Sequence, residues 1–293
     1  MITNLQNGGF LMQTVKLNNG IEMPIEGYGV FQIGPEETER CVLDALKTGY
    51  RSLDTAATYG NEEGVGKAIE KSGVPREEIF LTSKLWVEDQ GYESAKAAFE
   101  KSLKKLGTDY LDLYLIHQPY GDYYGSWRAM EELYSEGKIK AIGVSNFDAA
   151  RLVDLIMNQT IVPAVNQVEL HPFVQQTEAK KIMDEYGVQI ESWGPLAEGK
   201  HGILENTMLK KIADKHNKTV AQVILRWHLD RDVVIIPKSV RSERMKENLE
   251  VHDFSLDASD MEKIAGLDGQ QDMIVDHTNV EIVKVMNNSK TPE

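Results

Sequence analysis

Short apolar runs rich in Val, Ile, Leu and Tyr alternate along the chain with longer segments in which apolar residues recur every three or four positions. The first pattern is typical of buried strands and the second of amphipathic helices. Repeated alternation of the two indicates β-α-β units and a parallel sheet. The predicted strands cover residues 25–31, 52–54, 79–83, 110–116, 139–144, 164–168, 189–193 and 233–236.

Helical segments lie between these strands. They are predicted over residues 36–47, 64–71, 92–106, 127–136, 148–157 and 177–185. The connection between the last two strands is longer, because it holds one helix over 205–216 and a second that begins after Thr219. Eight parallel strands with return helices close naturally into a barrel, so the sequence predicts an α/β fold of the (β/α)8 TIM-barrel class.

A single domain is the better interpretation of the 293 residues, because barrels of about 250 residues form one unit and no Pro/Ser-rich linker divides this chain. We predict an N-terminal extension over residues 1–14, in which the second methionine, Met12, is either the natural start or the edge of a leader. The catalytic barrel is predicted over 15–276. After a helix over 259–265, a polar tail over 277–293 is expected to cross the barrel mouth.

Charge and composition narrow the class of protein. A net charge of −14 and a pI near 5.0 would repel a nucleic-acid backbone. No apolar run approaches the roughly 18 residues of a membrane span. The lone cysteine, Cys41, lies in an apolar helical pattern where burial is the plain explanation. These features predict a cytoplasmic protein that binds neither nucleic acid nor membrane.

Four polar residues follow or end predicted strands, at the end of a barrel where active sites lie. They are Asp54 in SLDTAATYG, Tyr59 in the same motif, Lys84 in LTSKLW and His117 in LYLIHQP. Each has an ordinary alternative, such as a turn cap, an exposed phenol, a solvated cation or a histidine bonded to a backbone carbonyl. Together they have a specific chemical use.

An ammonium beside a phenol favours the phenolate, so Lys84 would lower the pKa of Tyr59. The carboxylate of Asp54 would in turn keep Lys84 protonated. A neutral His117 could donate a hydrogen bond to the oxygen that Tyr59 protonates. This cluster supplies an acid and an oxyanion site but no nucleophile, so the missing reactant is a hydride donor.

A nicotinamide cofactor is the obvious donor, although no G-x-G-x-x-G motif follows any predicted strand. Instead, Lys238, Arg241, Arg244 and Lys246 follow the eighth strand and enter a helix. This is a common phosphate site in barrels, and an exposed helix face with alternating charge is the alternative. The cations favour a 2′-phosphate, and hence NADP(H).

Eight ordered motifs resemble the aldo-keto reductase family over about residues 15–276: GYGVFQIG, DTAATYGNEEGVGKAI, FLTSKLW, DYLDLYLIHQP, KIKAIGVSNF, NQVELHP, SWGPLAEG and IPKSVRSERMKEN. The resemblance implies that Tyr59 is the proton donor, Asp54 and Lys84 its partners and His117 the residue that orients the carbonyl. It implies that the nicotinamide is held by Ser145, Asn146, Gln167 and Trp193. It implies further cofactor contacts at Gly29, Val30, Lys238, Ser239, Val240, Arg244, Glu247 and Asn248.

Two departures from the family pattern, Gln118 after the histidine and Trp193 in place of a tyrosine, resemble a microbial branch of 2,5-diketogluconate and aldehyde reductases. The resemblance implies NADPH-dependent reduction of small aldehydes and ketones, and a monomer. Phe31, Trp86 and His117 are expected to contact substrate, together with loops over 118–127 and 197–203. The polar tail argues against a deep pocket.

Two other functions fit parts of the sequence. A metal-dependent hydrolase needs several ligands at the strand ends, yet only His117 and His171 lie near them and no H-x-H pair occurs. We therefore expect no metal. A regulatory relative that senses its cofactor with little turnover remains the alternative, against which the complete set of four polar residues counts.

Overall fold

The computed structural model describes residues 2–7 and 10–292, and its centre is a sheet of eight strands that all pair in parallel. The strands are β4 (Tyr28–Gly29), β5 (Ser52–Asp54), β6 (Phe80–Leu85), β7 (Leu113–Ile116), β8 (Ile142–Ser145), β9 (Val165–Glu169), β10 (Gln189–Trp193) and β11 (Val234–Ile235). Neighbours in the sheet follow chain order. The first and last edges meet where Gly27 N donates to Ile235 O at 2.7 Å. The predicted (β/α)8 barrel is confirmed.

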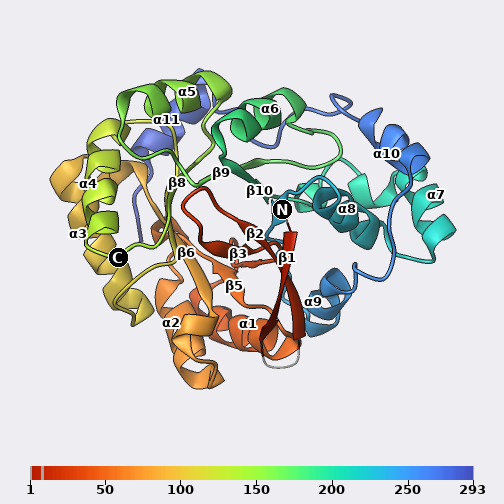
Figure 1. The fold of residues 1–293 in the computed structure, drawn as a ribbon, viewed down its shortest axis with the longest axis horizontal. Coiled ribbons are helices and arrows are strands. Elements are labelled where there is room, and N and C mark those ends of the chain that lie inside the picture. The colour runs from red at the N-terminus through yellow and green to blue at the C-terminus, as the bar shows by residue number, and fades with distance from the viewer. Residues whose placement is uncertain (1, 8–9, 293) are drawn as a thin grey trace.

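Helices surround the strands (Figure 1). They are α1 (Pro35–Thr48), α2 (Glu62–Ser72), α3 (Tyr92–Leu106), α4 (Tyr123–Ser135), α5 (Ala149–Asn158), α6 (Thr177–Tyr186), α7 (Thr207–His216), α8 (Val220–Leu229), α9 (Ser242–Leu249) and α10 (Ala258–Ala265). Both α7 and α8 lie between β10 and β11, so the long connection predicted there is confirmed. Thr219 caps α8 by accepting a hydrogen bond from Gln222 N.

Helix α4 begins earlier than predicted, at Tyr123 rather than at residue 127. Asp122 causes this, because its carboxylate accepts a hydrogen bond from Gly125 N and so satisfies a free donor of the first turn. The prediction of a loop over 118–127 was therefore wrong for its second half.

Close approach of the first strand to the last requires glycine at one position. A Cβ on Gly29 would lie only 2.9 Å from Ile236 O, which is shorter than real Cβ contacts. This glycine lets β4 lie against the segment after β11 and so helps to close the barrel next to the cleft described below.

A three-stranded antiparallel sheet of β1 (Ile2–Asn7), β2 (Phe10–Lys16) and β3 (Glu22–Pro24) covers the amino-terminal end of the barrel (Figure 1). Val15 and Met23 of this sheet share a buried apolar cluster with Leu115 and Val234 of the barrel strands. Strand β2 runs through position 14, where we predicted the extension to end.

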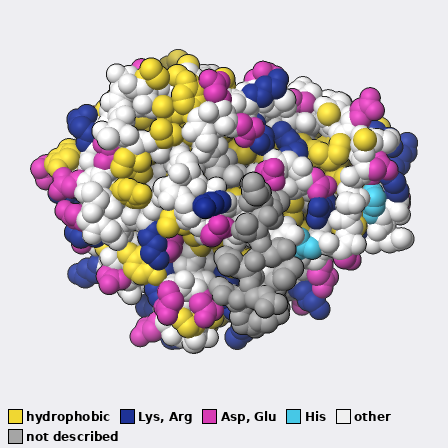
Figure 2. Space-filling model, viewed as in Figure 1, with side chains coloured by type: hydrophobic (Ala, Val, Ile, Leu, Met, Phe, Trp, Pro, Cys, Tyr) yellow, Lys and Arg dark blue, Asp and Glu magenta, His cyan; other side chains and the backbone are white. Residues whose placement is uncertain are grey.

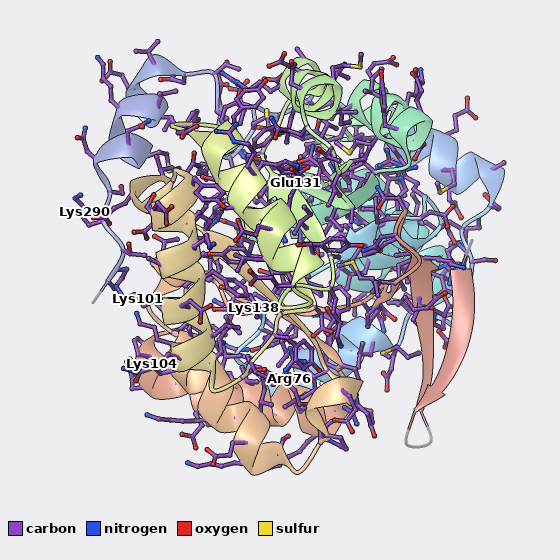
Figure 3. All side chains as sticks on the ribbon, turned by 60° about the vertical axis from the view of Figure 1, so that its left-hand side comes forward. Arg76, Lys101, Lys104, Glu131, Lys138 and Lys290 are labelled. Atoms are coloured by element: carbon purple, nitrogen blue, oxygen red, sulfur yellow. The ribbon has the colours of Figure 1, made fainter. Side chains whose placement is uncertain are left out.

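The tail crosses the opposite end of the barrel and contains helix α11 (Val280–Asn288), which we had not predicted. Val283 and Met286 pack against Trp86, Val87 and Tyr120, so the expectation of a purely polar tail was wrong. Beyond the helix, Lys290 pairs with Glu88 at 2.8 Å and lies on the same side of the molecule as Lys101 and Lys104 of α3 (Figure 3).

The surface carries both signs of charge. On the face that Figure 2 shows, Lys and Arg side chains are interspersed with Asp and Glu rather than gathered into one basic area. Within residues 2–7 and 10–292, no helix is long and apolar enough to cross a membrane.

Candidate active site

The four polar residues singled out in the sequence meet at the carboxyl end of the barrel. Asp54 ends β5, Lys84 lies in β6, His117 follows β7, and Tyr59 ends a short 3-10 helix (Ala57–Tyr59) after β5. Lys84 Nζ lies 2.5 Å from Asp54 Oδ1 and 3.4 Å from Tyr59 Oη. The rings of Tyr59 and His117 meet edge to face, with centroids 5.7 Å apart.

Lys84 keeps its proton although its side chain has no exposed surface. Burial lowers its pKa, but the charges of Asp54 and Tyr59 and the hydrogen bond to Asp54 overcome this, so that the pKa of Lys84 lies above its usual value. The Nζ also donates to Thr55 O at 3.0 Å. The predicted role of Asp54 in holding Lys84 charged is consistent with this geometry.

Tyr59 differs from our expectation. Burial raises its pKa and outweighs the Lys84 ammonium, which acts in the opposite direction, so the net shift is upward. The expected lowering was wrong because desolvation of a phenolate costs more here than one neighbouring cation returns. Tyr59 is therefore fully protonated at neutral pH, as a proton donor must be.

His117 is neutral at neutral pH. Burial, the Lys84 ammonium and His277 of the tail hold its pKa well below the usual 6.5. A neutral imidazole can donate one hydrogen bond without adding a charge beside Lys84. This agrees with the carbonyl-orienting chemistry expected from the sequence.

A cleft of about 1060 Å³ opens above this cluster. Its wall includes Phe31, Trp86 and His117, the three residues predicted to meet substrate. The ring of Trp86 lies 5.1 Å from that of His117, and its Nε1 donates to Ser289 O of the tail at 3.0 Å. The tail also lines the cleft with His277, Met286 and Ser289, as do Ile274 and Val275 just before it.

The four residues expected at the nicotinamide also line this cleft: Ser145, Asn146, Gln167 and Trp193. Hydrogen bonds join them into one unit. Trp193 Nε1 donates to Asn146 Oδ1 at 2.8 Å, Asn146 Nδ2 donates to Ser145 Oγ at 3.2 Å, and Ser145 Oγ donates to Gln167 O at 2.8 Å. Asn146 Nδ2 also donates to His117 O at 3.1 Å. Asn146 has a φ of 63°, in the left-handed region that asparagine tolerates, which turns its amide toward these partners.

Of the eight further positions expected to contact the cofactor, Gly29, Lys238 and Arg244 line the cleft. Five others do not: Val30, Ser239, Val240, Glu247 and Asn248. Glu247 accepts a hydrogen bond from Thr219 at 2.7 Å, and Tyr28 donates to the carbonyl of Ser239. All four cations of the predicted phosphate site, Lys238, Arg241, Arg244 and Lys246, are exposed, but only Lys238 and Arg244 line the cleft.

Our sequence interpretation missed Glu191, which lies in the middle of β10 with almost no exposed surface. Gln167 Nε2 donates to Glu191 Oε2 and to Asp54 Oδ2, both at 2.9 Å. A signal was available, because Glu191 lies two positions before Trp193 and so shares its side of the strand.

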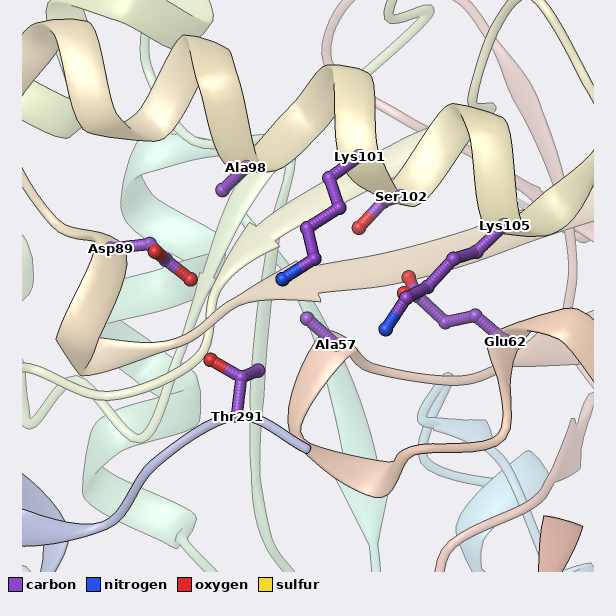
Figure 4. A pocket seen from close by; sticks show the side chains of 8 residues that line it. All are labelled: Ala57, Glu62, Asp89, Ala98, Lys101, Ser102, Lys105 and Thr291. Atoms are coloured by element: carbon purple, nitrogen blue, oxygen red, sulfur yellow. The ribbon is translucent and has the colours of Figure 1, made fainter. Parts of the chain in front are cut away.

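A second, very small cavity of about 10 Å³ lies beneath the tail, between α3 and the 3-10 helix that ends at Tyr59 (Figure 4). This volume holds about one water molecule. Glu62 in its wall accepts a hydrogen bond from Ser83 at 2.7 Å, and Ser83 is next to Lys84 in β6. The cavity is too small for a substrate. Within residues 2–7 and 10–292, no group of three or more His, Cys, Asp or Glu could hold a metal ion.

A barrel with a buried Asp-Lys-Tyr cluster and a neutral histidine at the floor of an aromatic cleft defines an oxidoreductase that reduces carbonyl groups. Residues 26–268 match the model of the Aldo/keto reductase family. The chain belongs to this family, as the sequence motifs predicted.

Three relatives illustrate the match. The chain is 56% identical over 260 residues to glyoxal reductase of Bacillus subtilis, covering 88% of this chain and 93% of the relative. It is 46% identical over 257 residues to methylglyoxal reductase DkgA of Escherichia coli, covering 87% and 93%. A crystal structure of a Bombyx mori aldo-keto reductase in complex with NADP superposes with a TM-score of 0.85 at 32% identity, covering 89% of this chain and 94% of that one.

Proposed function

We propose that this chain reduces small dicarbonyl aldehydes, such as glyoxal and methylglyoxal, to hydroxy-carbonyl products with NADPH. The observation that carries the proposal is the cluster of Asp54, Lys84 and Tyr59. Lys84 Nζ lies 2.5 Å from Asp54 Oδ1 and 3.4 Å from Tyr59 Oη, and the cluster faces the cleft beside neutral His117. The printed activities of two bacterial relatives support the substrate class. The aromatic wall of Phe31 and Trp86 suits compact substrates.

Each member of the cluster has one role. NADPH supplies a hydride to the carbonyl carbon when it is bound. Tyr59 donates its phenolic proton to the carbonyl oxygen, so that the C=O bond becomes an alcohol. The Lys84 ammonium stabilises the phenolate that forms when Tyr59 has given up its proton, and Asp54 keeps Lys84 charged. His117 donates a hydrogen bond that orients the carbonyl oxygen.

The residues around the cleft fit a nicotinamide dinucleotide phosphate. Amide and hydroxyl groups of Ser145, Asn146 and Gln167 suit the carboxamide, and the partly exposed ring of Trp193 suits stacking on the nicotinamide. Lys238 and Arg244 suit the 2′-phosphate. Gly29 lines the same cleft and is proposed to contact the cofactor. The resemblance to the family also implies contacts at Val30, Ser239, Val240, Glu247 and Asn248.

A substrate panel tests this function. Reduction of glyoxal, methylglyoxal, 4-nitrobenzaldehyde and a bulky steroid ketone would be followed by the loss of NADPH absorbance and ranked by kcat/KM. We expect the two dicarbonyls at the top of the ranking and the steroid at the bottom. Tight NADPH binding with no turnover of any carbonyl would favour a cofactor-sensing protein instead.

We also propose that the protein works as a monomer in the cytoplasm and binds no nucleic acid. The acidic net charge of −14 and the single, buried cysteine support this assignment. Light scattering of the purified protein would give a molar mass near 33.0 kDa for a monomer, whereas twice that mass would contradict it.

A further inference from the structure

Glu191 is a buried acid that the proposed reaction does not use. Its side chain lies inside the barrel and contacts Gln167, whose Nε2 donates to Glu191 Oε2 and to Asp54 Oδ2 at 2.9 Å each. The second oxygen of Asp54 accepts from Lys84. Glu191 thus belongs to a continuous series of hydrogen bonds that reaches the catalytic cluster.

The two carboxyl groups determine which way the Gln167 amide faces. A primary amide has two N–H donors on one atom and only acceptor sites on the other. With Asp54 and Glu191 on one side, both N–H groups are used by these acceptors. The reversed amide would place Gln167 Oε1 against the Asp54 carboxylate, which has no hydrogen to donate, and the hydrogen bond to Asp54 would be lost.

The charges around Glu191 allow it to accept a hydrogen bond from Gln167 at neutral pH. Burial and the nearby Asp54 charge raise the pKa of Glu191 to about 8, while the hydrogen bond from Gln167 and the Lys84 ammonium act in the opposite direction. At neutral pH Glu191 is therefore mostly a neutral acid, and one carboxyl oxygen still accepts from Gln167. The opposite charges of Asp54 and Lys84 then balance.

We propose that Glu191 is a positioning residue for the cofactor: together with Asp54 it fixes the Gln167 amide so that Oε1 faces the cleft and accepts a hydrogen bond from the nicotinamide carboxamide. The inference rests on the proposed use of NADP(H). It assigns to Glu191 a role that acts only through Gln167, and this makes it separable from a role in stability.

Two oxidised dinucleotides test this role by calorimetric titration. One is NADP⁺, and the other is its 3-acetylpyridine analogue, in which a methyl group replaces the carboxamide NH2 and cannot donate to Gln167. We expect E191L to weaken NADP⁺ binding about tenfold and to change binding of the analogue less than twofold. E191Q keeps an acceptor oxygen and should stay within about threefold of wild type for both.

Two further variants guard against indirect effects. Q189L removes a polar side chain from the same side of β10 that bonds to Asp232 O rather than to Gln167, and it should leave both affinities unchanged. In a Q167A background, E191L should cause no further loss of NADP⁺ affinity, because the two residues act as one unit. Thermal melting of every variant checks that it is folded.

Equal weakening of both dinucleotides by E191L, or a full additional loss in the Q167A background, would overturn the role of Glu191. An E191L protein that does not fold would leave the decision to E191Q and Q167A, and loss of the analogue's binding in Q167A would then contradict the proposal. If wild-type protein binds neither dinucleotide, the cofactor assignment itself fails and this inference fails with it.

Discussion

Lys84 is the residue on which the catalytic cluster depends. It is a cation with no exposed surface, held charged by Asp54 at 2.5 Å and in contact with Tyr59 at 3.4 Å. Burial is the largest cause that raises the pKa of Tyr59, and the Lys84 ammonium limits that rise. The pair therefore combines a phenol that keeps its proton at neutral pH with a charge that stabilises the phenolate once the proton has left.

Replacing Tyr59 with Phe should nearly abolish carbonyl reduction, by about 10²- to 10⁴-fold in kcat, because it removes the acid. NADPH affinity should stay close to wild type, since the phenol is separate from the cofactor contacts. Steady-state kinetics and a binding titration measure the two quantities. Tyr114→Phe is the matched control, because no described residue hydrogen-bonds its buried hydroxyl. A loss of affinity as large as the loss of rate would contradict the assignment.

Replacing Arg244 with Ala should weaken NADPH binding about 10- to 100-fold and NADH binding less than twofold, because the guanidinium would pair with the extra phosphate. Fluorescence titration with both cofactors gives the ratio. Lys246→Ala is the control, since Lys246 lies on the same helix but does not line the cleft. Equal losses for the two cofactors would remove the support for a phosphate contact at Arg244.

At the scale of elements, the tail is the part that our sequence interpretation missed. Strands 52–54 and 189–193 and the helix over 92–106 have the bounds predicted from apolar periodicity. Helix α11 packs on Trp86, Val87 and Tyr120, which lie far away in the sequence. Its own sequence, VEIVKVMNN, carries apolar residues three and four positions apart, so a helical signal was present in a tail that we interpreted as polar.

In the active site, the sequence interpretation missed one residue, Glu191, and the direction of one pKa shift, that of Tyr59. The four polar residues could be found because each ends or follows an apolar strand. Glu191 lies within a strand, where an acid is ordinarily solvent-exposed. Its spacing of two positions from Trp193 placed both side chains on one side of the strand, and the closed barrel shows that Glu191 points inward. The sign of the Tyr59 shift also needs the structure, because a sequence names the neighbouring cation but not the degree of burial.

Helix α11 should control the substrate end of the cleft. Val283→Asp would place an unpaired charge against Trp86 and Val87, release the helix and raise KM for glyoxal about fivefold or more. NADPH affinity should not change. Val285→Asp on the exposed side of the same helix is the matched control and should leave KM as it is. An identical effect of both substitutions would mean that packing of the helix is not what shapes the pocket.

At the scale of the whole molecule, buried histidines make stability depend on pH. Burial lowers the pKa of His228 to about 4 and holds that of His117 well below 6.5. Each of these histidines therefore binds more protons in the unfolded chain than in the folded protein between about pH 6.5 and pH 4, and each lowers the free energy of unfolding as the pH falls through this window. Glu191, whose pKa is raised, acts in the opposite direction. Urea denaturation of the wild type and of His228→Gln at a series of pH values isolates the histidine contribution, and the variant should lose less stability on acidification than the wild type does. An equal or larger loss in His228→Gln would contradict the prediction.

The most direct test of the proposed reaction follows the hydride from the nicotinamide of NADPH to the product. Purified protein would be mixed with methylglyoxal and NADPH that carries deuterium at both C4 positions of the nicotinamide, and the product would be analysed by mass spectrometry. The account predicts one carbon-bound deuterium in each hydroxy-carbonyl product and one NADPH consumed per product. A product without deuterium, or NADPH that remains unchanged, would contradict it.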